Sequence, residues 1–431
     1  MPSVDHISDL GDDLLLHVLR FLSDNARDVV CTSVLSTRWR HLWTRAPVLR
    51  ILQHKPGSTY DDGDDARFND FVHKVLARRA CRGAGADIDR LDLYAWHWPG
   101  KSRADVWLRR AMRHTVGSLL FNVEGVSDWR PSRVELPTTT RVTKMWLELP
   151  TTTRVTKMWL ELDGATLLLP PAVDFHKLTE LTLGGIGFSD DDGPRLGHLL
   201  SSPSCCPTLR KLTLSGLSGL HHLRLHGGAL ETLDLSGLKV RRLDVDTPRL
   251  TLLHAQGFFM QYLHDDHTSL TVRAPALERF KTSLQFGWLR VQYYAIKLLH
   301  ECRPIHGHTI CLFGPDYYHT PCGEGCGDCD LRGSWKDDVL SLEHLRKVKL
   351  GSFSGQEHYC LDMARLLLAS APVLESITVT AKTSIEPWCD DQELMLVESL
   401  ESSLPRGRGK WTARRAANAT VTLEYEWTQG A

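Results

Sequence analysis

The 431-residue sequence predicts an α+β protein, with a small three-helix unit at the N-terminus and a repetitive parallel-strand solenoid behind it. Two observations predict this class. The first fifty residues carry apolar residues at helical spacing in three short runs. The rest of the chain repeats the strand pattern apolar-x-x-apolar-x-apolar nine times. A chain of this length exceeds one ordinary core, so several domains or a solenoid are expected.

Residues 5–51 predict three short amphipathic helices. The first begins at Asp12 or Asp13, the second follows the capping residue Asn25, and the third follows Ser36 and ends before Pro47. A unit of this size buries too little surface to be stable alone, since domains below about 60 residues are only marginally stable. Its apolar side therefore packs either on the rest of this chain or on the helices of a partner, and periodicity leaves both open.

Two runs in this unit carry a resemblance. They are Leu10-x-Asp12-Asp13-x-Leu15 and Ser33-Val34-Leu35-Ser36-x-Arg38-Trp39-Arg40-x-Leu42-Trp43. They resemble the F-box of plant F-box/leucine-rich-repeat proteins. The resemblance implies a contact with the Skp adaptor of a cullin-based ubiquitin ligase. The residues expected at that contact, some of which must also form the core of the F-box itself, are Leu10, Leu14, Leu15, Val18, Leu19, Leu22, Val29, Trp39, Leu42 and Trp43.

One residue departs from the family pattern. Gly11 stands where the family usually has proline, whose ring pre-sets φ at the first helical turn. We expect this change to loosen the start of the first helix by a few tenths to about 1 kcal/mol.

The segment after the F-box predicts a linker and then repeats. Residues 52–66 contain Pro56-Gly57-Ser58 and four aspartates, which predict a solvated acidic linker; their spacing does not fit a calcium loop. The predicted solenoid spans 67–283. It opens with helices at 68–76 and 104–114 and strands at 90–94 and 118–123. The two strands lie about 28 residues apart, within the leucine-rich-repeat range.

The strand pattern then becomes explicit, beginning at residues 142, 155, 178, 209, 220, 230, 240, 345 and 374. Between 209 and 250 the starts are 10 or 11 residues apart, which is half of an ordinary repeat and leaves no room for a helix. The simplest geometry has two strands per turn, on both faces of the coil. Residues 192–202 can still hold a helix. The outer face is thus expected to carry helices early and strands or turns in the middle.

Residues 135–160 contain a perfect tandem copy of thirteen residues, Glu-Leu-Pro-Thr-Thr-Thr-Arg-Val-Thr-Lys-Met-Trp-Leu. Divergent repeats share only spaced apolar positions, so the copy is a recent duplication or a sequence error. A genuine copy would add a half-turn of the coil or a bulged loop.

The predicted segment 284–340 is an irregular insertion with a Cys-rich loop. His319, Cys322, Cys326 and Cys329 have the residue types of a tetrahedral zinc site. No second ligand pair follows at the usual spacing, so we expect a loop without metal and no cofactor.

Residues 341–431 resemble the C-terminal repeat block, called FBD-like, of the same plant family. The block predicts strands at 342–350, 374–380 and 419–427 and helices at 361–370 and 393–404. The basic run from Arg406 to Arg415 is expected as a solvated turn rather than a nuclear signal.

Composition and motifs exclude several functions. A net charge of −1 predicts no binding to nucleic acid or to an anionic membrane, and no apolar run approaches a membrane span. Eleven cysteines without a secretory signal predict reduced thiols in the nucleus or cytoplasm. The catalytic motifs sought are absent; Gly351-Ser-Phe-Ser-Gly355, for example, has Phe353 where a nucleophile belongs.

The sequence therefore predicts a non-catalytic substrate-recognition subunit of a Skp-cullin-F-box ubiquitin ligase. The F-box would bind the adaptor, and the solenoid would bind a target protein that the sequence does not name. The alternative is a leucine-rich-repeat scaffold with a degenerate F-box that recruits no ligase.

Overall fold

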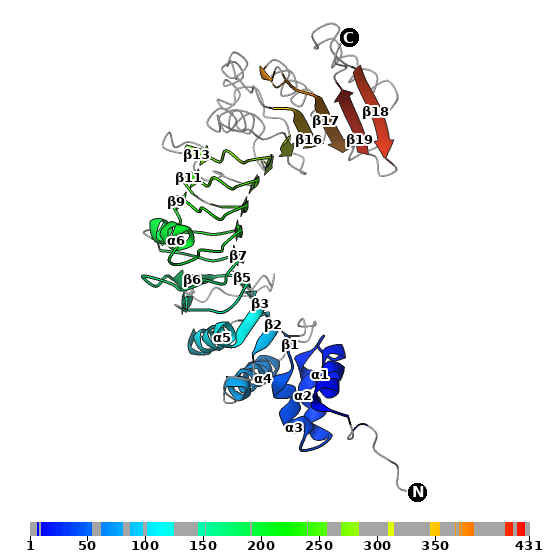
Figure 1. Cartoon of the computed structure of the whole chain (residues 1–431), viewed down its shortest axis with the longest axis vertical. Coiled ribbons are helices and arrows are strands. Elements are labelled where there is room, and N and C mark those ends of the chain that lie inside the picture. The colour runs from blue at the N-terminus through cyan, green and yellow to red at the C-terminus, as the bar shows by residue number, and fades with distance from the viewer. Residues whose placement is uncertain are drawn as a thin grey trace, which may run out of the picture. The chain divides into compact units, whose positions relative to one another are not determined.

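The chain was analysed as a computed structural model, shown in Figure 1, and it forms two compact units, residues 1–220 and 221–431. The residues that the structure describes are 7, 10–53, 62–80, 87–97, 101–124, 145–150, 152–189, 192–238, 240–256, 269–283, 309–313, 345–353, 367, 370–371, 373–382, 410–416 and 420–426.

The first unit combines helices with a parallel sheet. Its helices are α1 (Asp12–Phe21), α2 (Ala26–Cys31), α3 (Trp39–Leu42), α4 (Asp62–Ala80), α5 (Lys101–His114) and α6 (Asp192–Ser201), with 3-10 turns η1 (Thr32–Val34) and η2 (Trp43–Arg45). Its strands are β1 (Val48–Leu52), β2 (Ile88–Ala95), β3 (Thr115–Val123), β4 (Met145–Glu148), β5 (Lys157–Leu162), β6 (Ala165–Leu168), β7 (Glu180–Gly184) and β8 (Lys211–Ser215).

Strands β1, β2, β3, β5, β7 and β8 lie in that order in the sheet, each parallel to the next. A recurring pattern of backbone hydrogen bonds sets the register of these strands. The carbonyl of Thr156 accepts the N–H groups of Thr179 and Glu180 at 2.7 and 3.2 Å. The carbonyl of Thr179 in turn accepts Arg210 and Lys211 at 2.9 and 3.0 Å. One carbonyl ahead of each strand therefore satisfies two donors of the next repeat.

Two expectations for this unit need correction or refinement. Helix α4 begins at Asp62, so it includes Asp64 and Asp65, which we predicted to lie in the acidic linker. Carboxylates are favourable in the first turn of a helix, which explains why an acidic run ahead of an apolar period joins the helix. The third predicted helix is short, since α3 has four residues and continues directly into η2.

The two tandem copies occupy different sheets. Lys157-Met-Trp-Leu-Glu-Leu162 forms β5 of the main sheet, whereas β4, from the same sequence in the first copy, pairs in parallel with β6 in a two-stranded sheet. Bridges from Thr166 to Gly187 and from Gly187 to Ser218 continue that second row. The first copy therefore provides a strand of the second, smaller sheet.

The second unit has two rows of strands. One row is β10 (Thr232–Ser236), β12 (Leu252–Gln256), β14 (Arg279–Ser283), β15 (Thr309–Phe313), β16 (Lys347–Phe353) and β17 (Ser376–Lys382), all parallel. The other is β9 (His222–Leu225), β11 (Arg242–Asp246) and β13 (Ser269–Arg273). Strands from 220 to 256 alternate between the rows, which is the arrangement that the 10- to 11-residue spacing predicts.

The end of the second unit reverses direction. Strand β19 (Thr420–Glu426) lies antiparallel to β17, and β18 (Lys410–Ala416) lies antiparallel to β19 (Figure 1). The basic segment that we predicted as a turn is therefore partly a strand. Alternation of Trp411, Ala413 and Arg415 with polar residues is compatible with a strand, but the charges masked that pattern. The predicted helix at 393–404 lies outside the described residues.

The N-terminal helices, residues 12–45, are joined to the sheet of the first unit by buried contacts. Arg79 of α4 is 1% exposed; its Nη1 donates to the carbonyl of Thr44 and its Nη2 donates to that of Ala46 at 2.7 Å. Burial lowers the pKa of Arg79 to about 10, so the guanidinium stays charged at neutral pH. The Arg27 guanidinium of α2 also lies 5.7 Å from the ring centre of Phe71 in α4.

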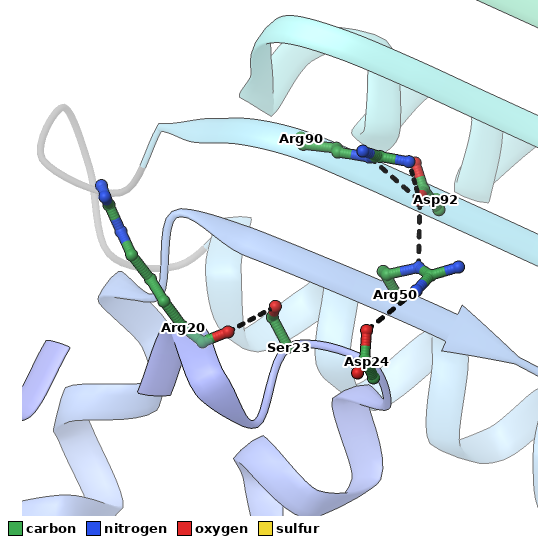
Figure 2. Close-up of polar contacts among 6 residues, drawn as sticks. All are labelled: Arg20, Ser23, Asp24, Arg50, Arg90 and Asp92. Atoms are coloured by element: carbon green, nitrogen blue, oxygen red, sulfur yellow. Dashed lines mark hydrogen bonds and ion pairs between the residues drawn. The ribbon is translucent and has the colours of Figure 1, made fainter. Parts of the chain in front are cut away.

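An ion-pair chain makes a second junction. Arg50 of β1 donates from Nη1 to Asp24 at 3.0 Å, and its Nε lies 3.2 Å from Oδ2 of Asp92 in β2 (Figure 2). Arg90 approaches the same Asp92 oxygen at 2.9 Å. Asp92 is almost fully buried, and two guanidinium groups compensate its charge.

Replacing Arg79 by methionine is expected to destabilise the first unit by about 2–4 kcal/mol, because two buried carbonyls then lose their donors. Urea unfolding monitored by tryptophan fluorescence measures this loss. Arg78→Met is the matched control, since the neighbouring Arg78 is exposed. Equal midpoints for Arg79→Met and Arg78→Met would show that the junction does not depend on this guanidinium.

Candidate functional site

The residues predicted for the adaptor contact separate into a buried and an exposed group. Leu10 is half-buried, and Leu14, Val18 and Leu22 are exposed. The members that form the core of the N-terminal helices are Leu15, Leu19, Val29, Trp39, Leu42 and Trp43. The structure thus assigns six of the ten residues to the interior, where they hold the helices together.

Helix α1 has two apolar stripes. Leu15 and Leu19 face inward, where α1 packs against α3 and η2. Leu14, Val18 and Phe21 follow each other at i, i+4 and i+7, which places them on one line, roughly 100° around the helix from Leu15 and Leu19. Their exposed fractions are 56%, 41% and 75%. We call these three residues the α1 stripe.

Sequence reasoning missed part of the exposed apolar surface. Phe21 was not among the predicted contacts, although its position seven residues after Leu14 places it on the stripe. Val34 and Leu35, at the end of η1, are 84% and 63% exposed, and Ile7 is also exposed. The chain enters a 3-10 turn at Val34, where the side chain points outward.

Ion pairs fix the start of α1. Asp12 accepts from Nη2 of Arg38 at 2.6 Å and from Nη1 of Arg45 at 2.9 Å. The hydrogen bond from Arg38 is the main reason that the pKa of Asp12 lies below its usual value; Arg45 lowers it further. This contribution to stability is present above pH ~4 and is lost as the carboxylate protonates at lower pH. Asp12 and Arg38 both belong to the runs that resemble the plant F-box, so this ion pair joins two residues of the family pattern.

Gly11 occupies the cap position of α1 without strain. Its φ of −64° and ψ of 156° are values that proline also adopts, and its carbonyl accepts from Leu14 and Leu15 at 3.1 Å. The glycine therefore leaves the helix start in the geometry that the family's proline would impose.

The described residues contain no group of three or more His, Cys, Asp or Glu side chains placed to hold a metal ion. The four predicted zinc ligands, His319, Cys322, Cys326 and Cys329, lie outside these residues. Burial raises the pKa of Cys206 to about 12, which keeps that thiol protonated and a poor nucleophile.

An internal cavity beneath α6 offers no catalytic group either. Its lining is apolar apart from a cysteine thiol, so it has no charged or hydroxyl group to orient a substrate. The lining includes Leu149, Met158, Leu181, Phe175, Leu196 and Cys206. Within the described part of the chain, no helix is both long and apolar enough to cross a bilayer.

Comparison with known proteins finds matches for the N-terminal helices and for the repeats. Residues 7–51 match the family model of the F-box domain, and residues 104–290 match the model of the leucine-rich repeats in the FBD-associated F-box protein At5g56370. The chain is 32% identical over 223 residues to the F-box/LRR-repeat protein At3g59210 of Arabidopsis thaliana, covering 50% of this chain and 40% of the relative.

Other relatives share shorter segments. The rice protein MEIOTIC F-BOX protein MOF is 33% identical over 151 residues, covering 33% of this chain and 30% of its own. The F-box/FBD/LRR-repeat protein At4g26340 of Arabidopsis thaliana is 33% identical over 100 residues, covering 22% of each chain. The chain spans between 22% and 53% of the length of the curated relatives that it matches.

The N-terminal helices and the repeats are thus each recognised separately, in the order that these plant relatives have them. The chain therefore carries an F-box domain at residues 7–51 and, at residues 104–290, leucine-rich repeats like those of FBD-associated F-box proteins.

Proposed function

We propose that this chain is the substrate-recognition subunit of a Skp-cullin-F-box ubiquitin ligase, with the α1 stripe at the contact with the Skp adaptor. The observation that carries the proposal is the exposure of Leu14, Val18 and Phe21 on a helix whose other apolar side is already buried. Aligned exposed apolar residues on a small unit mark an interaction surface. The F-box family match supplies the class of partner.

The buried group and the exposed group have different roles in this proposal. Leu15, Leu19 and Trp43 complete the core of the F-box, so the helices fold on the sheet without a partner. The α1 stripe then contributes its apolar area only when a partner covers it. Burial of such area stabilises a complex by about 25 cal/mol per Å², before the costs of association.

The repeat region supports the second half of the proposal. We infer that its strands form a solenoid whose side chains bind a target protein. The chain itself then forms and breaks no bonds, and acts in the nucleus or cytoplasm. Its contribution is positional, because holding the target near a ubiquitin-charged enzyme raises the effective concentration of the reacting groups.

Replacing Leu14 and Val18 by aspartate is expected to weaken adaptor binding by at least about a hundredfold, because two charges would enter the apolar contact. Co-purification with a Skp adaptor and calorimetric titration measure the effect. Both side chains are exposed in the free protein, so its melting temperature should change little. Val373→Asp is the control, since Val373 is an exposed apolar residue of the second unit.

A variant of a buried residue shows how loss of the core differs from loss of the α1 stripe. Leu15→Ala is expected to lower the melting temperature, because Leu15 is fully buried, so its effect on binding says little about the contact. Wild-type adaptor affinity in the folded Leu14→Asp, Val18→Asp variant would refute the assignment of the α1 stripe.

The alternative function, a scaffold whose F-box recruits no ligase, rested on Gly11. Gly11→Pro is expected to raise stability by about 0.4–1 kcal/mol and to leave adaptor affinity unchanged, since the native φ already suits proline. Gly11→Ala is the control for loss of glycine alone. A wild-type protein that fails to bind adaptor, and a Gly11→Pro variant that gains binding, would favour the degenerate F-box.

A further inference from the structure

The open face of each sheet carries the residues that alternate with buried core positions. In the first unit, three cations on this face, Arg50, Arg90 and Lys157, have carboxylate partners on the sheet. Arg50 and Arg90 share Asp92, and Nζ of Lys157 lies 2.6 Å from Glu180 on the next strand. The charges of these three cations are therefore compensated within the chain.

The second unit departs from this pattern at β14, β15 and β16. Phe280 of β14 and Val348 of β16 are buried, and both stand in register with Ile310 of β15. The residues directly before and after Phe280 and Val348 on their strands therefore belong to the open face. One row on that face is Arg279, Thr309 and Lys347, and the next is Lys281, Cys311 and Lys349. Two strands thus bring four basic residues into adjacent rows.

Three of these cations have described side chains. Arg279, Lys347 and Lys349 are exposed, and none forms an ion pair with another residue of the described ranges. Residues two apart on a strand are separated by roughly 7 Å, and the outer strands of three by roughly 10 Å. Arg279, Lys347 and Lys349 therefore form a patch, which we call the basic patch.

Among the described residues, two sets of carboxylates flank the patch along the register. Oδ2 of Asp234 in β10 lies 3.1 Å from Nδ1 of His254 and accepts a hydrogen bond from it when that nitrogen carries the proton. Glu424 and Glu426 of β19 stand in register with Thr378 and Ser376, so they lie two strands beyond β16. Uncompensated like charges on neighbouring strands disfavour the free state, and an incoming anion relieves them.

We propose that the basic patch binds an acidic segment of the target protein, rich in Asp and Glu. The proposal deepens the proposed function, because it rests on the repeat region being the target-binding part. Charge complementarity selects the occupant. A nucleic acid fits less well, because the patch is confined to three strands and the chain as a whole has a net charge of −1.

The test uses the full chain bound to its adaptor and a fluorescent peptide of alternating Glu and Ser. A peptide with Gln in place of Glu and a single-stranded RNA of the same length are compared in parallel. We expect the Glu peptide to bind, with an affinity that falls as salt rises. Lys347→Glu with Lys349→Glu should weaken binding roughly tenfold or more.

A matched control reverses the same amount of charge elsewhere in the second unit. Arg249→Glu with Arg273→Glu changes an exposed turn and an exposed residue of the other row of strands, and it should leave affinity unchanged. Lys347→Gln with Lys349→Gln should give an intermediate loss, and it replaces the Glu variant if that variant melts early.

Absence of binding by the wild type, equal affinity for the Glu and Gln peptides, or equal losses in the two double variants would overturn the proposal. Tighter binding of the RNA would replace it with nucleic-acid recognition. Adaptor co-purification of the same variants separates these outcomes from failure of the proposed function, which depends on the α1 stripe.

Discussion

Two backbone carbonyls, those of Thr44 and Ala46, set the geometry on which the F-box depends. They lie where the last turn of the F-box ends, and the final carbonyls of a helix have no partner within it. The buried Arg79 of α4 supplies that partner to both, through charge-assisted hydrogen bonds. The chain then enters β1 directly, which pairs with β2 in parallel. The F-box is thus built onto the edge of the sheet.

This junction also fixes the position of the α1 stripe within the first unit. Because Arg79, Arg50 and the buried Trp43 hold the F-box to β1, α4 and β2, the α1 stripe has a fixed orientation within the first unit. Under the proposed function a fixed orientation of the stripe matters, since a slack connection to the adaptor would lower the effective concentration of the groups that it brings together.

Much of the fold could be predicted from the sequence because its signals are periodic. Spacing alone predicted the helix–strand order of the early repeats and the alternating rows around 209–256. The site was harder, because a helix with apolar residues on two sides has the same letters whether a side is buried or exposed. Leu14 and Leu15 are adjacent and identical, and only packing against α3 and η2 decides which one faces water. The tandem copies show the same dependence on context, since one sequence forms β5 in the main sheet and β4 in the two-stranded sheet.

The most direct test of this account is native-state hydrogen exchange of the amides of α3, η2 and β2 in the full chain. If Arg79 and Arg50 join the F-box to the sheet, these amides should open together, with the same free energy and the same dependence on denaturant. Exchange from α3 and η2 at a much lower free energy, while β2 stays protected, would mean that the F-box opens by itself and would contradict the account.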